Sequence, residues 1–137
     1  MTNRERISHV DTAWLRMDRP TNLMQIVGVM IFDGRIDFPR LKRTVEARLL
    51  RYRRFRQCAT IEGNGAWWVD DRNFDLDAHL KHTLLPFPGG TRELQHYVAE
   101  LASTPLNPHR PLWEFQVVEM ETGDSALVAR IHHAIAD

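Results

Sequence analysis

The apolar residues of this chain have the spacing of helices in two separate segments. In residues 38–52 they recur at intervals of three and four, which places them on one face of a helix. Residues 91–101 show the same spacing over a shorter length, and in residues 11–17 a short helix with the apolar contacts Trp14 and Leu15 is expected to end before Pro20. We expect Asp11 and Thr91 to cap these two helices, because short polar side chains accept hydrogen bonds from the first free amides of a helix. Three helices are therefore predicted.

Between these helices lie runs of β-branched and aromatic residues that predict strands. Residues 23–32 are rich in Ile and Val without polar alternation, which is typical of a strand buried on both faces. Two pairs of shorter runs, each joined by a Gly-containing turn, predict hairpins over residues 57–69 and 113–131. Residues 70–88 are acidic, end in Pro86 and Pro88 and are followed by Gly89 and Gly90, so we expect irregular structure there. Together the elements predict an α/β fold, a mixed-sheet sandwich.

Composition limits the class of protein. The 137 residues are 43% hydrophobic and 26% charged, which is typical of one soluble globular domain. Cys58 is the single cysteine, so an internal disulfide and a thiolate zinc cluster are excluded. The N-terminus lacks the apolar stretch of a signal peptide, and the longest apolar run, residues 26–32, is too short to span a membrane. We therefore expect a cytoplasmic protein.

The net charge is zero, but the charges are unevenly distributed. Residues 1–56 hold 13 basic and 6 acidic side chains, whereas residues 57–137 hold 5 and 12. Eight basic residues lie between Arg40 and Arg56, with Glu46 as the one acid. Two interpretations stay open: a surface for anionic membrane lipid or CoA phosphates, or a solvated helix face with structural arginines. No nucleic-acid-binding motif accompanies the basic residues, so we expect no nucleic acid partner.

The candidate chemistry lies at the end of the chain, where the last predicted strand leads into His132, His133 and Asp137. Neighbouring side chains of an extended segment point to opposite faces, so one histidine can face a channel while the other faces the interior. A histidine suits proton transfer because its ordinary pKa lies near neutrality. A metal site is the alternative, but neighbouring histidines diverge and a third ligand is not evident, so we expect no metal.

This cluster and three other segments resemble a known family. His132–Asp137 matches the HHxxxD part of the HHxxxDG motif of CoA-dependent acyltransferases, a superfamily that includes chloramphenicol acetyltransferase and peptide-synthetase condensation domains. The opening DTAWLRMDRPTNLMQIVGVMIFDG, the segment RFRQ at residues 54–57 and RPLWEF at residues 110–115 resemble bacterial wax ester synthase/acyl-CoA:diacylglycerol acyltransferases in order and spacing. The resemblance covers nearly the whole chain and implies a chloramphenicol-acetyltransferase-like half-domain.

The resemblance implies a role for several residues. His133 corresponds to the general base, which takes a proton from the hydroxyl of a fatty alcohol or diacylglycerol so that this oxygen attacks the thioester of acyl-CoA. His132 is implied to be buried and structural, and Asp137 to pair with Arg54 or Arg56. Pro111, Leu112 and Trp113 are implied to shape the substrate channel. Acyl-CoA is a co-substrate in this scheme, and no resident cofactor is expected.

The family folds as two similar halves with the active site between them, and residues 1–137 match the first half. The motif glycine that would follow Asp137 is absent. We therefore expect the C-terminal half of the enzyme to be a partner and the isolated chain to be inactive. Because the substrates are lipids, contact with a membrane or lipid-inclusion surface is also considered. The alternative is a non-catalytic module that keeps the fold and binds a lipid surface or a partner.

Overall fold

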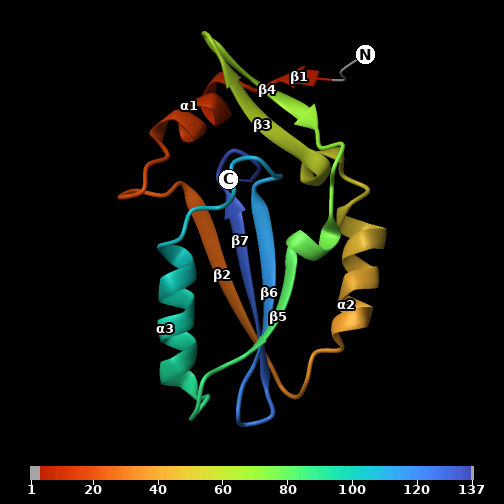
Figure 1. Cartoon of the computed structure of the whole chain (residues 1–137), viewed down its shortest axis with the longest axis vertical. Coiled ribbons are helices and arrows are strands. Elements are labelled where there is room, and N and C mark those ends of the chain that lie inside the picture. Colours follow the sequence, from red (N-terminus) through yellow and green to blue (C-terminus); the bar gives the residue numbers. More distant parts are fainter. Residues whose placement is uncertain (1–3, 137) are drawn as a thin grey trace.

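The computed structural model describes residues 4–136, which form two β-sheets placed end to end, with helices packed around them (Figure 1). The larger sheet has the strand order β2-β7-β6-β5 and the smaller one the order β1-β4-β3. The strands of the larger sheet are β2 (Gln25–Phe32), β5 (Leu80–Leu84), β6 (Trp113–Glu119) and β7 (Ser125–His132). Those of the smaller sheet are β1 (Arg4–Arg6), β3 (Gln57–Glu62) and β4 (Gly65–Asp70).

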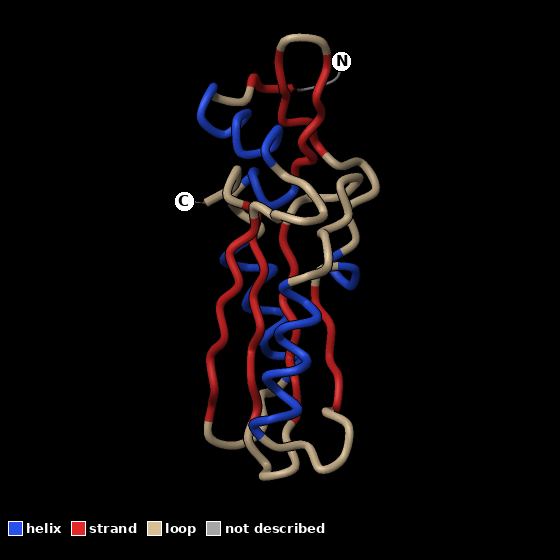
Figure 2. The backbone as a smooth tube through the Cα atoms, turned by 90° about the vertical axis from the view of Figure 1, so that its left-hand side faces the viewer, coloured by secondary structure: helices blue, strands red, loops and turns tan. Residues whose placement is uncertain are grey.

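Helices cover both faces of the larger sheet. The helices are α1 (His9–Met17), α2 (Phe38–Thr44) and α3 (Thr91–Ala102), with a π-helical turn at Val45–Leu49 that extends α2 and shorter helical turns at Arg53–Arg56 and Leu76–Ala78. In Figure 1, α3 and α2 lie on opposite sides of the strands, and α1 lies beside the smaller sheet. Figure 2 shows the same arrangement from the side, with α3 running along the sheet. In the described residues 4–136, no helix is long and apolar enough to cross a membrane.

The apolar core follows the alternation of the strands. Leu94 of α3 packs with Val118 of β6 and Val128 of β7 on one face of the larger sheet. On the other face, Val45 after α2 packs with Trp113 of β6. A third cluster joins the smaller sheet to α1 and to the residues after β7, and includes Trp68 and Ala134. The larger sheet therefore has a core on each face, and the residues that follow β7 pack against the smaller sheet.

The fold class predicted from the sequence is confirmed. β6 and β7 form the antiparallel hairpin expected in residues 113–131, and β3 and β4 form the hairpin expected in residues 57–69. β5 runs parallel to β6, whereas β2 and β6 run antiparallel to β7, so the larger sheet is mixed. The helical stripe predicted in residues 38–52 is found over α2 and its π-helical extension.

Several local predictions were wrong. β2 is an edge strand that pairs with β7 alone among the strands of residues 4–136, so its apolar side chains are largely exposed rather than buried on both faces. The irregular region predicted at residues 70–88 contains β5, and β1 was not expected at all. The cap of α1 is Ser8, whose Oγ accepts from the Asp11 amide, and the cap position of α3 is Gly90 rather than Thr91. Each miss concerns a boundary or a pairing that distant residues decide.

Candidate active site

The end of β7 brings the two histidines to the junction of the two sheets. β7 and its extension alternate in direction, so Arg130 and His132 share the face that α3 covers, while Ile131 lies on the other face. His132 is buried, with 2% of its surface exposed, and His133 is partly exposed. The two rings therefore have different surroundings.

His132 is held at both ring nitrogens. Its Nε2 lies 3.1 Å from Asp18 Oδ2, and its Nδ1 accepts a hydrogen bond of 3.0 Å from the amide of Ala134. Because Nδ1 accepts, the ring proton must be on Nε2, which donates to the carboxylate. Burial lowers the pKa of His132 below its ordinary value, although the hydrogen bond that the ring donates to Asp18 acts in the opposite direction. At neutral pH this ring is uncharged and fixed in one tautomer.

His133 is held by its backbone and by one aromatic contact. Its amide donates to the carbonyl of Met24 at 2.9 Å, which continues the pairing of β7 with β2. Its ring stacks on Trp14 of α1 with 4.6 Å between ring centroids and 20° between planes. Within residues 4–136, His133 Nδ1 is buried and has no hydrogen-bond partner. No carboxylate of the described residues therefore orients this ring, in contrast to His132.

The two arginines considered as partners of Asp137 differ in their contacts. Arg54 lies over the ring of Trp68 at 4.4 Å and makes a long contact of 3.5 Å with Glu5, while its buried Nη1 has no partner among residues 4–136. Arg56 donates from Nε to the carbonyl of Leu50 at 2.8 Å. Asp137 itself lies outside the described residues, so its predicted ion pair stays a prediction.

Pro111, Leu112 and Trp113 are all buried next to the histidines. The carbonyl of Leu112 accepts from the amide of His132 at 3.0 Å, which ties this segment to β7. Trp113 donates from Nε1 to the carbonyl of Phe55 at 2.8 Å and stacks on His79. The segment therefore packs against the site through its backbone as well as its side chains.

The same segment separates two small cavities. Leu112 and His132 line a cavity of about 140 Å³ whose other walls include Asp18. Pro111 and Trp113 line a second cavity of about 220 Å³, next to His79. His133 is not among the residues that line either of these cavities. One cavity thus lies beside His132 and the other beside Trp113.

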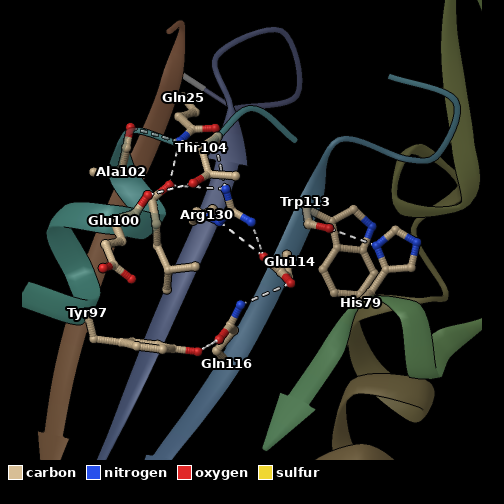
Figure 3. Close-up of polar contacts among 11 residues, drawn as sticks. Gln25, His79, Tyr97, Glu100, Ala102, Thr104, Trp113, Glu114, Gln116 and Arg130 are labelled. Atoms are coloured by element: carbon tan, nitrogen blue, oxygen red, sulfur yellow. Dashed lines mark hydrogen bonds and ion pairs between the residues drawn. The ribbon is translucent and has the colours of Figure 1, made fainter. Parts of the chain in front are cut away.

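A buried polar network fixes the C-terminal end of α3 to β7 and β6 (Figure 3). Arg130 is 6% exposed and pairs with Glu114, and its Nη1 donates to the carbonyls of Leu101 at 3.1 Å and Thr104 at 2.7 Å. Further members are Gln25, which donates to the same carbonyls and to that of Ala102, and Gln116, which joins Glu114 to the hydroxyl of Tyr97. The network lies two residues before His132 on the same face of β7.

The sequence did not point to Asp18 or to the role of Trp14. Asp18 is 114 residues from His132 along the chain, and Trp14 was expected only to be an apolar contact of its helix. The motif around the histidines gives no information about residues so far away along the chain. In the part of the chain that the structure describes, no three His, Cys, Asp or Glu side chains come together as a metal site would need.

Comparisons with known proteins show which family and fold this chain shares. The wax ester synthase/diacylglycerol acyltransferase catalytic domain matches residues 7–137. The protein named "Probable diacyglycerol O-acyltransferase tgs3" of Mycobacterium tuberculosis is 33% identical over 138 residues, which are 95% of this chain and 51% of that protein. The wax ester synthase/diacylglycerol acyltransferase from Marinobacter aquaeolei VT8 is 25% identical, with a TM-score of 0.82, over 96% of this chain and 34% of that one.

A more distant structure shares the fold alone. The starter condensation domain of rhizomide synthetase RzmA is 15% identical, with a TM-score of 0.72, over 96% of this chain and 34% of that one. The chain thus spans about a third to a half of these relatives. The family match, the two relatives and the tandem histidines at the end of β7 all agree, and the chain belongs to the wax ester synthase/diacylglycerol acyltransferase family.

Proposed function

We propose that this chain supplies the general base, His133, of an acyl-CoA-dependent O-acyltransferase whose acceptor is diacylglycerol or a fatty alcohol. The observation that carries the proposal is the contrast between the two histidines. His132 is buried and uses both ring nitrogens in hydrogen bonds, so it is not free to exchange a proton with a substrate. His133 is partly exposed, and its ring is oriented by stacking alone among the described residues.

The proposed reaction needs one base and no acyl-enzyme. Nε2 of His133 takes the proton of the acceptor hydroxyl while Nδ1 keeps its own proton, and the acceptor oxygen attacks the thioester carbonyl of acyl-CoA. The tetrahedral intermediate collapses with loss of the CoA thiolate, which receives the proton from the imidazolium. A well-placed base contributes about 10²–10⁴-fold, and holding both substrates together contributes a further large factor.

The supporting roles follow the same scheme. Arg54, rather than Arg56, is the proposed partner of Asp137, because Arg56 is already bonded to Leu50 whereas Arg54 Nη1 is buried without a partner in residues 4–136. Pro111, Leu112 and Trp113 are proposed to shape one wall of the substrate channel. Acyl-CoA enters as a co-substrate, and the scheme requires no further cofactor.

We also propose that the remaining part of the family's length is the partner of this chain. Five large apolar residues of β2 are between 38% and 63% exposed, which leaves an apolar edge on the larger sheet: Ile26, Val29, Met30, Ile31 and Phe32. Exposed apolar patches of this kind mark interaction sites. A second half that covers these residues would bury well above about 2,000 Å² of accessible surface in the interface, as expected when one apolar core is divided between two chains. Without it, we expect no acyl transfer.

The test is an acyltransferase assembled from this chain and a second chain that covers the remaining length of the Marinobacter aquaeolei enzyme. Acyl transfer from acyl-CoA is measured with a fatty alcohol and with diacylglycerol. His133→Ala is expected to lower the rate by at least about 10²-fold, while acyl-CoA binding persists. The matched control is His96→Ala, which removes an exposed histidine of α3. Activity of His133→Ala within a few-fold of the control would contradict the assignment.

Contact with an anionic lipid surface is the second candidate function. It would apply equally if the chain were a non-catalytic module that keeps the acyltransferase fold. In the basic segment between Arg40 and Arg56, Lys42, Arg53 and Arg54 pair with carboxylates. Arg43 and Arg48 are exposed, and no ion pair within residues 4–136 involves them. Replacing both with Gln should weaken binding to phosphatidylserine vesicles by about 1 kcal/mol each, whereas Arg53→Gln should change it less. Equal partitioning of all variants would assign the segment to structure.

A further inference from the structure

We propose that Asp18 is a positioning residue that sets the place of His133 through His132 and through the start of β2. The inference rests on the proposed function of His133, and it assigns a role to a residue for which the family motif supplies none. Asp18 follows α1 directly, and it is joined to the site by contacts that no local sequence pattern predicts.

The contacts form a closed ring. Asp18 Oδ1 accepts from the amide of Met24 at 2.9 Å, and Asp18 Oδ2 accepts from His132 Nε2 at 3.1 Å. The carbonyl of Met24 accepts from the amide of His133 at 2.9 Å, and His133 is the next residue after His132. One carboxylate therefore connects the entry of β2 and the exit of β7, which are the two backbone segments that carry the proposed base.

The carboxylate is chemically required at this place. His132 Nδ1 accepts from the amide of Ala134, so Nε2 must carry the proton and donate it to residue 18. The amide of Met24 is a second donor to the same side chain. Two donors thus converge on one group, and a carboxylate offers two acceptor oxygens for them. An asparagine of nearly equal size offers one oxygen and places an NH₂ group against the other donor.

The same helix also fixes the ring of His133. Trp14 precedes Asp18 by four residues, a spacing that places both side chains on the same side of α1 and the residue that follows it. The indole of Trp14 stacks on His133 at 4.6 Å, while Asp18 bonds His132. Because no described side chain bonds His133 Nδ1, the orientation of this ring depends on where α1 places Trp14. Loss of the Asp18 contacts should therefore release both rings.

The first experiment uses the 137-residue chain and NMR of labelled imidazole nitrogens. In the unchanged chain at pH 7, His132 should be the Nε2–H tautomer, and cross-relaxation should connect the rings of Trp14 and His133. Asp18→Asn should abolish the Trp14–His133 cross-peaks while those between Ile7 and Trp68 in the neighbouring apolar cluster persist. The matched control is Asp33→Asn, which makes the same change at an exposed turn. Retention of the ring cross-peaks in Asp18→Asn would overturn the proposal.

A measurement on the unchanged chain covers the case in which Asp18→Asn does not fold. The amides of Met24 and His133 belong to the same ring of contacts, so both should exchange slowly with solvent and have similar protection factors. Free exchange of the Met24 amide, or an Nδ1–H tautomer at His132, would overturn the proposal without any variant.

The second experiment measures activity in the assembled acyltransferase. Asp18→Asn should lower kcat about tenfold to a hundredfold, because a small displacement of the His133 ring from the acceptor hydroxyl slows proton transfer by a factor of this size. The KM for acyl-CoA should be nearly unchanged. In a His133→Ala background the same change should have no further effect on the rate. Full activity of His133→Ala would refute the general base and leave the NMR result standing. Unchanged kcat in Asp18→Asn, with an inactive His133→Ala, would refute only the positioning role.

Discussion

The buried pair Arg130–Glu114 supports a quantitative prediction on stability. The two side chains are 7% and 13% exposed, so each charge has lost most of its water and depends on the other. Glu114→Gln keeps the shape but removes the negative charge opposite Arg130. Removing one partner of a buried pair costs about 3–5 kcal/mol, because the remaining charge is left buried without compensation. We expect a loss near the lower limit, because the carbonyls of Leu101 and Thr104 still accept from Arg130.

The double-mutant cycle isolates the interaction between the two charges. Arg130→Met leaves Glu114 with a donor only from Gln116, and we expect a similar cost of about 3–5 kcal/mol. The double variant removes both charges, and Gln25 still donates to the carbonyls that Arg130 served. Its loss should be smaller than the sum of the two single losses by a coupling energy of about 2–3 kcal/mol, the upper part of the range for directly bonded residues.

The assay is urea unfolding followed by tryptophan fluorescence, since Trp113 is 1% exposed and lies next to Glu114. The matched control is the pair Arg4–Glu62, which has a similar contact of 3.1 Å but side chains that are 43% and 58% exposed. Exposed pairs contribute about 0–1 kcal/mol, so this cycle should show little coupling. Equal coupling energies in the two cycles would refute the argument that burial gives the Arg130–Glu114 pair its weight.

Two further predictions concern protons. Burial lowers the pKa of both His132 and His79 below the ordinary value of 6.5, so the unfolded chain binds protons more readily than the folded one. Stability should therefore fall as the pH drops below about 6.5, by up to about 1.4 kcal/mol per pH unit for each histidine, and His79→Gln should reduce this slope in urea unfolding between pH 7.5 and 5. An unchanged slope would contradict the assignment. Burial also raises the pKa of the Cys58 thiol to about 11, so iodoacetamide should react with it far more slowly at pH 8 in the folded chain than in urea, and equal rates would contradict this.

The sequence predicted those parts of the fold that depend on neighbouring residues. The hairpins of residues 57–69 and 113–131 were found because short turns join runs of β-forming residues. The helical stripe of residues 38–52 was found because its apolar spacing is local as well. β5 was missed because only two of its five residues are apolar and its strand character depends on parallel pairing with β6. The exposure of β2 was missed because an apolar run does not reveal whether its strand is central or at an edge.

The same division holds at the candidate site. The alternation of side chains along a strand predicts that His132 and His133 face opposite ways, and this stays a prediction because β7 ends at His132. It could not show what each ring would meet. Asp18, Met24 and Trp14 reach the histidines only because β2 pairs with β7 and α1 packs at the junction of the two sheets. The sequence alone determined which residues are the candidates for the proposed chemistry. The tertiary structure decided which of them is buried, bonded and oriented, since hydrogen bonds and stacking depend on distances in space that the separation along the chain does not give.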